Sequence, residues 1–204
     1  DAIEAFTNAI ALNHQLSAAY AERGTLYSFT GQYDKAIADY STAIDIEPDN
    51  SRIYSLRAHA FFSKRDYDNA IENYNNAINR EPNDISTYTL RGDAYNNKGE
   101  YAKAIKDYNR VISAYQLRYD QEKNKKISGN ELIIAGLAEN LAWAYVGRGS
   151  AYLNEGKYDS AIVEYKNAIA VAPKFGPGYS GIGTVHYKKG EYEMAIENLT
   201  KGIS

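Results

Sequence analysis

The sequence predicts an all-α fold made of repeated pairs of helices, and three observations lead to this prediction. A Tyr-x-x-Ala-Ile segment recurs five times, beginning at Tyr33, Tyr67, Tyr101, Tyr158 and Tyr192. The first three copies are spaced by 34 residues, and the same spacing separates Pro48 from Pro82. A Gly-x-x-Tyr segment precedes several of the copies, for example at residues 24–27 and 92–95. A period of this length is typical of a helix–turn–helix repeat.

Small residues recur on both helices of each predicted pair, where they let the helices approach closely. The first helices carry glycine or alanine at one place and the second helices carry alanine at another, as in the pair Gly24 and Ala36. The chain has 20 tyrosines against 5 phenylalanines, and most tyrosines fall at fixed places in the repeat. Because a buried aromatic side chain removes about 150–250 Å² from water, we expect these tyrosines to form the core.

Glycines mark the turn inside four of the five pairs, at Gly31, Gly99, Gly156 and Gly190. The end of a helix often needs a left-handed residue, which glycine adopts at little cost. Arg65 stands at this place in one repeat, where we expect it to cost about 1 kcal/mol. Prolines close the second helices, because proline lacks the N–H group that a helix interior needs.

These features together resemble the tetratricopeptide repeat (TPR), a 34-residue helix–turn–helix unit. The resemblance implies a right-handed superhelical solenoid that forms a single array over residues 1–204. Residues 1–16 correspond to half a repeat, and the last repeat is truncated. The repeats cover the ranges 17–50, 51–84, 85–118, 142–175 and 176–204.

An insertion interrupts the array at residues 119–141. Apolar residues continue with helical spacing on both sides of a polar stretch at residues 123–126, and Ser128-x-x-Glu131 is typical of a capping box that opens a helix. We therefore expect two ordinary helices to be lengthened into an extended helical hairpin. A flexible loop is the alternative.

Three consecutive apolar residues in the insertion, Leu132, Ile133 and Ile134, point to different sides of the predicted helix. They either pack on a neighbouring repeat or form a docking patch for a partner or a second copy.

Composition and motifs exclude several classes of function. A net charge of −3 and a pI near 5.7 argue against a nucleic-acid partner, and the sequence contains no apolar stretch long enough to insert into a membrane. Cysteine is absent and the three histidines are dispersed, so we expect no catalytic residues, no metal site and no cofactor. The compartment stays open, with the cytoplasm slightly favoured. The chain begins inside a repeat, and we expect a native N-terminus upstream.

In TPR proteins, first-helix residues line a concave groove that binds a peptide or protein, and the resemblance places such a groove here. Asparagine amides could pair with the backbone of an extended peptide, and phenylalanines could anchor apolar side chains. The residues that correspond to groove positions include Thr25, Phe29, Arg52, Ser55, His59, Phe62, Thr89, Asp93, Asn96, Asn97, Val146, Ser150, Asn154 and Tyr187.

The expected function is thus that of a non-catalytic scaffold or adaptor with a protein or peptide ligand. Two alternatives stay open. The chain could self-associate into a homo-oligomer through the insertion or through uncapped ends of the array, or it could recruit substrates for a larger enzyme.

Overall fold

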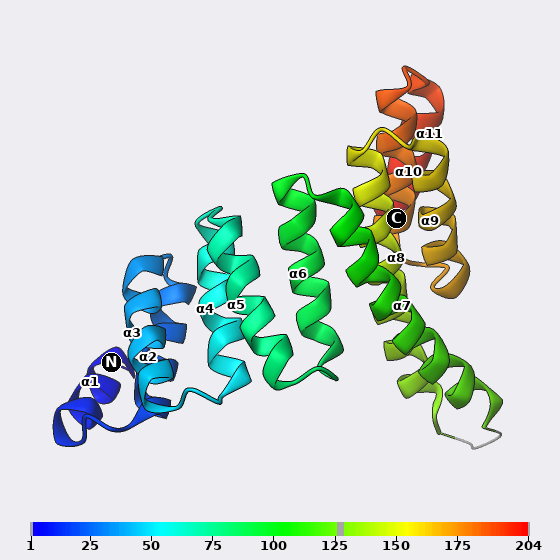
Figure 1. The fold of residues 1–204 in the computed structure, drawn as a ribbon. Coiled ribbons are helices and arrows are strands. Elements are labelled where there is room, and N and C mark those ends of the chain that lie inside the picture. The colour runs from blue at the N-terminus through cyan, green and yellow to red at the C-terminus, as the bar shows by residue number, and fades with distance from the viewer. Residues whose placement is uncertain (1, 126–128, 204) are drawn as a thin grey trace. The chain divides into compact units, whose positions relative to one another are not determined.

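The computed structural model describes residues 2–125 and 129–203, and within them every regular element is an α-helix (Figure 1). This confirms the predicted all-α class. The helices are α1 (Ala2–Leu12), α2 (Ser17–Phe29), α3 (Tyr33–Ile46), α4 (Ser51–Ser63), α5 (Tyr67–Arg80), α6 (Ile85–Lys98), α7 (Tyr101–Asn124), α8 (Glu131–Asn154), α9 (Tyr158–Val171), α10 (Gly176–Lys188) and α11 (Tyr192–Ile203).

The chain forms two compact units, Asp1–Ala94 (unit 1) and Tyr95–Ser204 (unit 2). The division falls inside α6. In unit 1, α2 packs on α3 and α4 on α5, and α3 joins the two pairs by packing on α4. In unit 2, each helix from α7 to α11 packs on the next one along the chain. Each unit is therefore a run of stacked helical hairpins.

Glycine permits the close approach of the two helices in a hairpin. A Cβ atom added to Gly24 of α2 would lie 2.9 Å from Cε1 of Tyr40 on α3. The same substitution at Gly149 of α8 would place the added atom 2.9 Å from Cε1 of Tyr165 on α9. In both hairpins the glycine makes room for a tyrosine ring.

The tyrosines form much of the core, as expected. Tyr40, Tyr74, Tyr108 and Tyr165 are almost completely buried, one in each second helix from α3 to α9. Tyr192 differs, because 62% of its surface is exposed. Its counterparts on earlier helices are half-buried, whereas no helix of the described chain follows α11 and covers this side of it.

The turns inside the hairpins are left-handed, as predicted. Gly31, Gly99, Gly156 and Gly190 have φ angles between 76° and 88°. Arg65 has a φ of 61°, and it is the only residue other than glycine with a positive φ in the described ranges.

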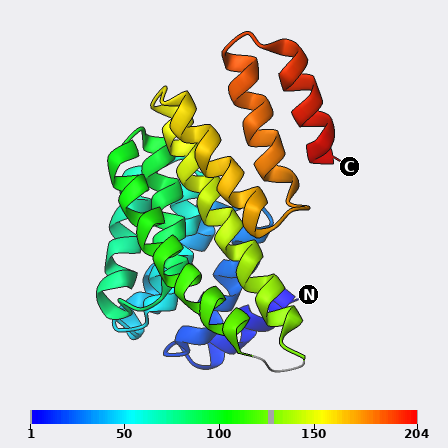
Figure 2. The same ribbon diagram turned by 90° about the vertical axis from the view of Figure 1, so that its right-hand side faces the viewer.

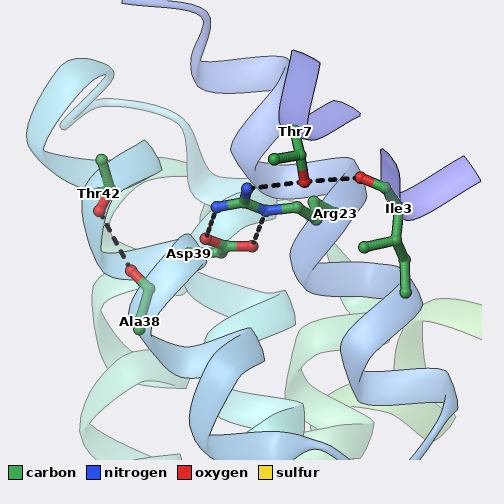
Figure 3. A network of polar contacts seen from close by, with 6 residues as sticks. All are labelled: Ile3, Thr7, Arg23, Ala38, Asp39 and Thr42. Atoms are coloured by element: carbon green, nitrogen blue, oxygen red, sulfur yellow. Dashed lines mark hydrogen bonds and ion pairs between the residues drawn. The ribbon is translucent and has the colours of Figure 1, made fainter. Parts of the chain in front are cut away.

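A partly buried polar network crosses the first three helices (Figure 3). Arg23 on α2 donates to both carboxylate oxygens of Asp39 on α3, with distances of 2.8 and 2.7 Å. Its remaining nitrogen donates to the Oγ1 atom of Thr7 on α1, at 3.1 Å. The hydrogen bond with Asp39 raises the pKa of the Arg23 guanidinium. One side chain thus ties three helices together.

The insertion lengthens two helices, since α7 and α8 have 24 residues each whereas other helices have 11 to 14. Contacts join them along their length. Arg148 donates to Asn109 at 2.6 Å, the Tyr145 hydroxyl lies 3.4 Å from Oε1 of Gln116, and Asn130 donates to the carbonyl of Glu122 at 2.8 Å. Figure 2 shows the first half of α8 continuing past the turn between α9 and α10.

The start of α8 differs from the capping box that the sequence indicated. Ser128, the expected capping residue, lies outside the described residues. The helix begins at Glu131, and Asn130 precedes it as the N-cap residue without a side-chain hydrogen bond to the helix. The Asn130 side chain instead contacts Glu122 of α7, so it links the two arms of the hairpin.

Candidate functional site

A pocket of about 330 Å³ lies on the first-helix side of unit 1, between α2 and α4. Three residues predicted for the groove, Thr25, Phe29 and His59, line this pocket. The Phe29 ring is 92% exposed, and the His59 side chain is exposed as well. Leu56 and Tyr33 add apolar surface. The structure therefore brings these three residues together around one hollow.

Buried tyrosines reach this face from the second helices. The hydroxyl of Tyr40 donates to Oγ1 of Thr25 at 3.3 Å, and Tyr40 also lines the pocket. Burial raises the pKa of Tyr40, although the hydrogen bond with Thr25 acts in the opposite direction. The phenol therefore stays neutral at physiological pH and serves as a fixed polar group at the base of the pocket.

The other predicted groove residues of unit 1 are spread along α4 and α6. Arg52 forms an exposed ion pair with Glu22 at 3.2 Å, and the hydroxyls of Ser55 and Thr87 lie 3.3 Å apart. The Phe62 ring packs edge-on against Tyr67, with centroids 5.6 Å apart. Thr89 and Asp93 are half-buried on α6.

Unit 2 brings together two of the predicted asparagines. The amide nitrogen of Asn154, at the end of α8, donates to Oδ1 of Asn96 on α6 at 3.1 Å. Ser150, one turn before Asn154, lies 3.3 Å from the hydroxyl of the buried Tyr165. This contact repeats the arrangement of Thr25 and Tyr40 in unit 1. Val146 is half-buried on the same helix.

The remaining predicted residues of unit 2 are exposed. Asn97 follows Asn96 near the end of α6. Tyr187 lies on α10, and its ring centroid is 5.9 Å from that of Tyr192. Both rings are mostly exposed, so they present aromatic surface to solvent.

Sequence reasoning left out one residue at a repeat position that it assigned to the groove, Trp143. It is the only tryptophan in the chain, and it is the second residue of the predicted repeat 142–175. The equivalent residue of the repeat 51–84 is Arg52, which was assigned to the groove, so the same register would have identified Trp143. Half of its surface is exposed, and its ring packs edge-on against Phe175 with centroids 4.9 Å apart.

The predicted docking patch lies on the inserted part of α8. Leu132 and Ile133 are 87% and 55% exposed, whereas Ile134 is half-buried. The three side chains therefore do face different sides of the helix, and two of them contribute apolar surface.

The described parts of the chain contain no group of three or more His, Cys, Asp or Glu side chains that could hold a metal ion. None of the helices in residues 2–125 and 129–203 is both long and apolar enough to span a membrane.

Comparison with protein families agrees with the repeat pattern. A family model described as "TPR repeat" matches residues 30–65, 58–99 and 149–190, and one described as "Tetratricopeptide repeat" matches residues 85–116. The chain belongs to the tetratricopeptide-repeat family. TPR proteins of this kind are typically scaffolds for protein interactions without catalytic activity, so membership supports that general role here.

A curated TPR protein is similar over a short stretch. This chain is 37% identical over 59 residues to small glutamine-rich tetratricopeptide repeat-containing protein 2 of Mycosarcoma maydis. The match covers 29% of this chain and 17% of that protein. The matched part is thus less than a fifth of the length of the curated relative.

Solved TPR structures share the fold of nearly the whole chain. A MamA protein has a TM-score of 0.66 at 21% identity and covers 92% of this chain and 90% of its own. YrrB, described as a TPR protein with an unusual peptide-binding site, has a TM-score of 0.64 at 19% identity and covers 98% and 92%. The APC/C complex Cut9–Hcn1 gives 0.69 at 17% identity, with 98% and 36% covered. These likenesses confirm the TPR-type fold.

Proposed function

We propose that this TPR chain is a non-catalytic adaptor that binds a peptide segment of a protein partner along its first-helix face. The observation that carries the proposal is the pocket between α2 and α4, which gathers Thr25, Phe29 and His59. Exposed aromatic residues beside a hollow are typical of interaction hot spots, because they supply large apolar area in one place.

The chemistry of this face fits an extended peptide better than a small molecule. The pocket has a volume of about 330 Å³, enough for one large side chain. Phe29, which lines it, is exposed to solvent. In unit 2, Asn154 donates only one of its amide hydrogens to Asn96. The two amides therefore retain donor and acceptor capacity that suits the alternating N–H and C=O groups of a peptide backbone.

The test starts from a phage-displayed library of random 12-residue peptides, selected on the full chain. We expect the selected peptides to carry a large apolar residue. Their affinity, measured by isothermal titration calorimetry, should fall at least tenfold in Phe29→Ala and in His59→Ala. Leu12→Ala is the matched control, because Leu12 is also an exposed apolar residue of unit 1 but lies on α1, outside the pocket. Peptides that bind both pocket variants as tightly as the wild type would overturn the proposal.

Self-association through the hairpin is a second candidate, favoured by the exposure of Leu132 and Ile133. Light scattering at several protein concentrations tests it on the wild type and on Ile133→Lys/Ile134→Lys. A wild-type dimer that the variant abolishes would support this candidate. A monomer at every concentration for both proteins would eliminate this candidate.

A further inference from the structure

The inserted part of α8 forms one wall of an apolar cavity, broadly open to solvent, that an ordinary repeat would lack. The cavity has a volume of about 550 Å³ and lies within unit 2, beside the turn between α9 and α10. Its lining comprises Ala135, Ala138 and Glu139 from α8, Val171 from the end of α9, and the turn residues Ala172, Pro173, Lys174 and Phe175. All three residues from α8 precede Ala142, where the repeat after the insertion begins. The insertion therefore creates this site.

The walls of the cavity are fixed by packing. Ala138 and Phe175 are buried, and Phe175 forms a core cluster with Ala142 and Ala168. Trp143 packs edge-on against Phe175 and holds its ring in place. Because alanines line one side and a fixed aromatic ring lies on the other, the cavity can receive a bulky side chain without rearrangement of the backbone.

The cavity also adjoins the face of α8 that is proposed to contact a peptide. Leu132, Glu139 and Trp143 are exposed on α8 and recur every four or seven residues, so they share one side of the helix. Val146 and Ser150 continue this side toward the groove residues at the C-terminal end of α8. A partner segment that follows α8 thus passes over the mouth of the cavity.

Charge indicates what accompanies the apolar side chain. The charged residues of α8 are Glu131, Glu139 and Arg148. Arg148 forms an ion pair with Glu164 of α9, with 2.6 Å between Nη2 and Oε2. The exposed surface of α8 is therefore acidic. Glu139 lines the cavity on the α8 side, whereas Lys174 lines it on the side of the turn. A basic group next to the inserted side chain, on the side of α8, complements Glu139.

We infer that this cavity is a specificity subsite for a protein partner, which inserts one large apolar side chain flanked by a lysine or arginine that faces Glu139. The inference rests on the proposed peptide-binding function, but it concerns a different site, in unit 2, built by the insertion. A second copy of the chain is disfavoured as the occupant, because two copies paired through the same face of α8 would bring their Glu139 carboxylates toward each other.

The absence of cysteine from the chain permits a direct test. Ala135→Cys places a single thiol at the cavity, and Asn140→Cys is the matched control, because Asn140 is an exposed residue of α8 that does not line the cavity. Each variant is equilibrated with a mixture of phenylethyl and hydroxyethyl disulfides, and intact-mass spectrometry gives the ratio of the two adducts. We expect the phenylethyl adduct to be enriched about tenfold more in Ala135→Cys than in Asn140→Cys, because burial of an aromatic ring is favourable by that much or more. Equal ratios in the two variants would overturn the inference.

A second arm tests the charge. The Ala135→Cys variant is offered 4-(aminomethyl)benzyl and 4-carboxybenzyl disulfides at low ionic strength, and we expect the cationic adduct to dominate. Glu139 is one helical turn from residue 135, so Glu139→Gln in the Ala135→Cys background should remove the preference. A preference that survives Glu139→Gln would contradict the role of Glu139. Light scattering could show a wild-type dimer that Ala135→Arg dissociates. A second copy of the chain would then be the occupant of the cavity, and the proposed partner would be wrong.

The outcomes separate this inference from the proposed function. Loss of peptide binding in Phe29→Ala concerns unit 1 only, whereas the adduct ratios report on the cavity without any peptide. The phenylethyl adduct could be enriched in Ala135→Cys while Phe29→Ala and His59→Ala bind peptides as tightly as the wild type. This result would support the subsite and reject the pocket of unit 1 as the peptide-binding site.

Discussion

Arg23 and Asp39 form a two-point ion pair that joins α2 to α3, with both nitrogen–oxygen distances below 3 Å (Figure 3). The same spacing of 16 residues links Arg57 to Asn73 at 2.8 Å and Arg148 to Glu164 at 2.6 Å. In these three pairs an arginine of the first helix meets an acceptor of the second helix, and the acceptor Asn73 is uncharged.

This difference predicts unequal costs of removing the acceptor. Asp39→Ala should destabilise the chain by about 2–3 kcal/mol, because Arg23 is left as a largely buried charge without its counter-ion. Asn73→Ala should cost less, about 1.5 kcal/mol, because Arg57 loses a hydrogen bond to an uncharged acceptor but no counter-ion. Urea denaturation gives both values. Arg23→Leu/Asp39→Leu is the control and should cost less than Asp39→Ala alone. If Asp39→Ala and Asn73→Ala lowered the free energy of unfolding equally, the charge of the acceptor would not contribute to stability.

The left-handed turn at Arg65 predicts a stabilising substitution. Arg65→Gly should raise the free energy of unfolding by about 1 kcal/mol, because glycine adopts a positive φ without the steric cost that a Cβ atom brings. Thermal unfolding followed by circular dichroism measures the change. Arg65→Ala serves as control, since it removes the same side chain but keeps the Cβ atom. If Arg65→Ala stabilised the chain as much as Arg65→Gly, the turn geometry would not be the cause.

Two glycines of α8 predict opposite effects of the same substitution. A Cβ atom added to Gly136 meets nothing within 4 Å, so Gly136→Ala should stabilise the helix by about 0.5–1 kcal/mol. An atom added to Gly147 would lie 2.5 Å from the ring of the buried Tyr108. Gly147→Ala should therefore destabilise the chain by about 1–3 kcal/mol, as overpacking does. Urea denaturation of the two variants side by side checks both signs, and a stabilising Gly147→Ala would contradict the close approach of α7 and α8.

Asp84 predicts a pH dependence of stability. It precedes α6 and accepts hydrogen bonds from the backbone N–H of Ser86, at 3.1 Å, and from the hydroxyls of Ser86 and Thr87. Burial alone would raise the pKa of Asp84, but these hydrogen bonds outweigh it and hold the pKa below its ordinary value. The folded state therefore favours the carboxylate, as expected for a residue that caps a helix.

The sign follows from linkage. The pKa of Asp84 is lower in the folded than in the unfolded chain. The contribution of its carboxylate to the free energy of unfolding is therefore complete above the pKa of the unfolded chain, about 3.9. This contribution is lost as the pH falls through the pKa of the folded chain. Asp84→Ala should cost about 1 kcal/mol at pH 7, and the difference from wild type should shrink below pH 4. Urea denaturation of both proteins at pH 7 and pH 3 measures it. A difference that is the same at both pH values would exclude the ionised cap.

Most of the fold was predictable because it follows from local rules that recur with the repeat. Glycine in the turns, alanine where helices meet and tyrosine in the core each satisfy one packing requirement, and the period repeats that requirement. The positive φ of Arg65 was also predictable, because glycine stands at the same place in the other repeats. The burial of Tyr192 was wrongly expected, because burial depends on what packs against a helix as well as on the place of a residue within it.

The candidate site was predictable only in part. The register indicated that Thr25, Phe29 and His59 lie on first helices, but it could not show that they share a pocket, since that depends on the spacing of α2 and α4. The cavity beside α8 was not foreseen at all. It arises where an irregular insertion passes a turn about 35 residues further along the chain, and no periodic pattern relates the two.

The lengthened helices α7 and α8 have a consequence for how such an array can change during evolution. Repeat arrays commonly grow or shrink by whole repeats, and each change shifts every surface beyond it. Here about ten residues, or roughly 15 Å, were added to each of two helices along their own axes. Apart from its buried residues Leu137, Ala138 and Leu141, the inserted portion of α8 can therefore change in sequence while the stacking of the other hairpins is kept. It is the part of the chain where a new specificity can be acquired at least risk to the old fold.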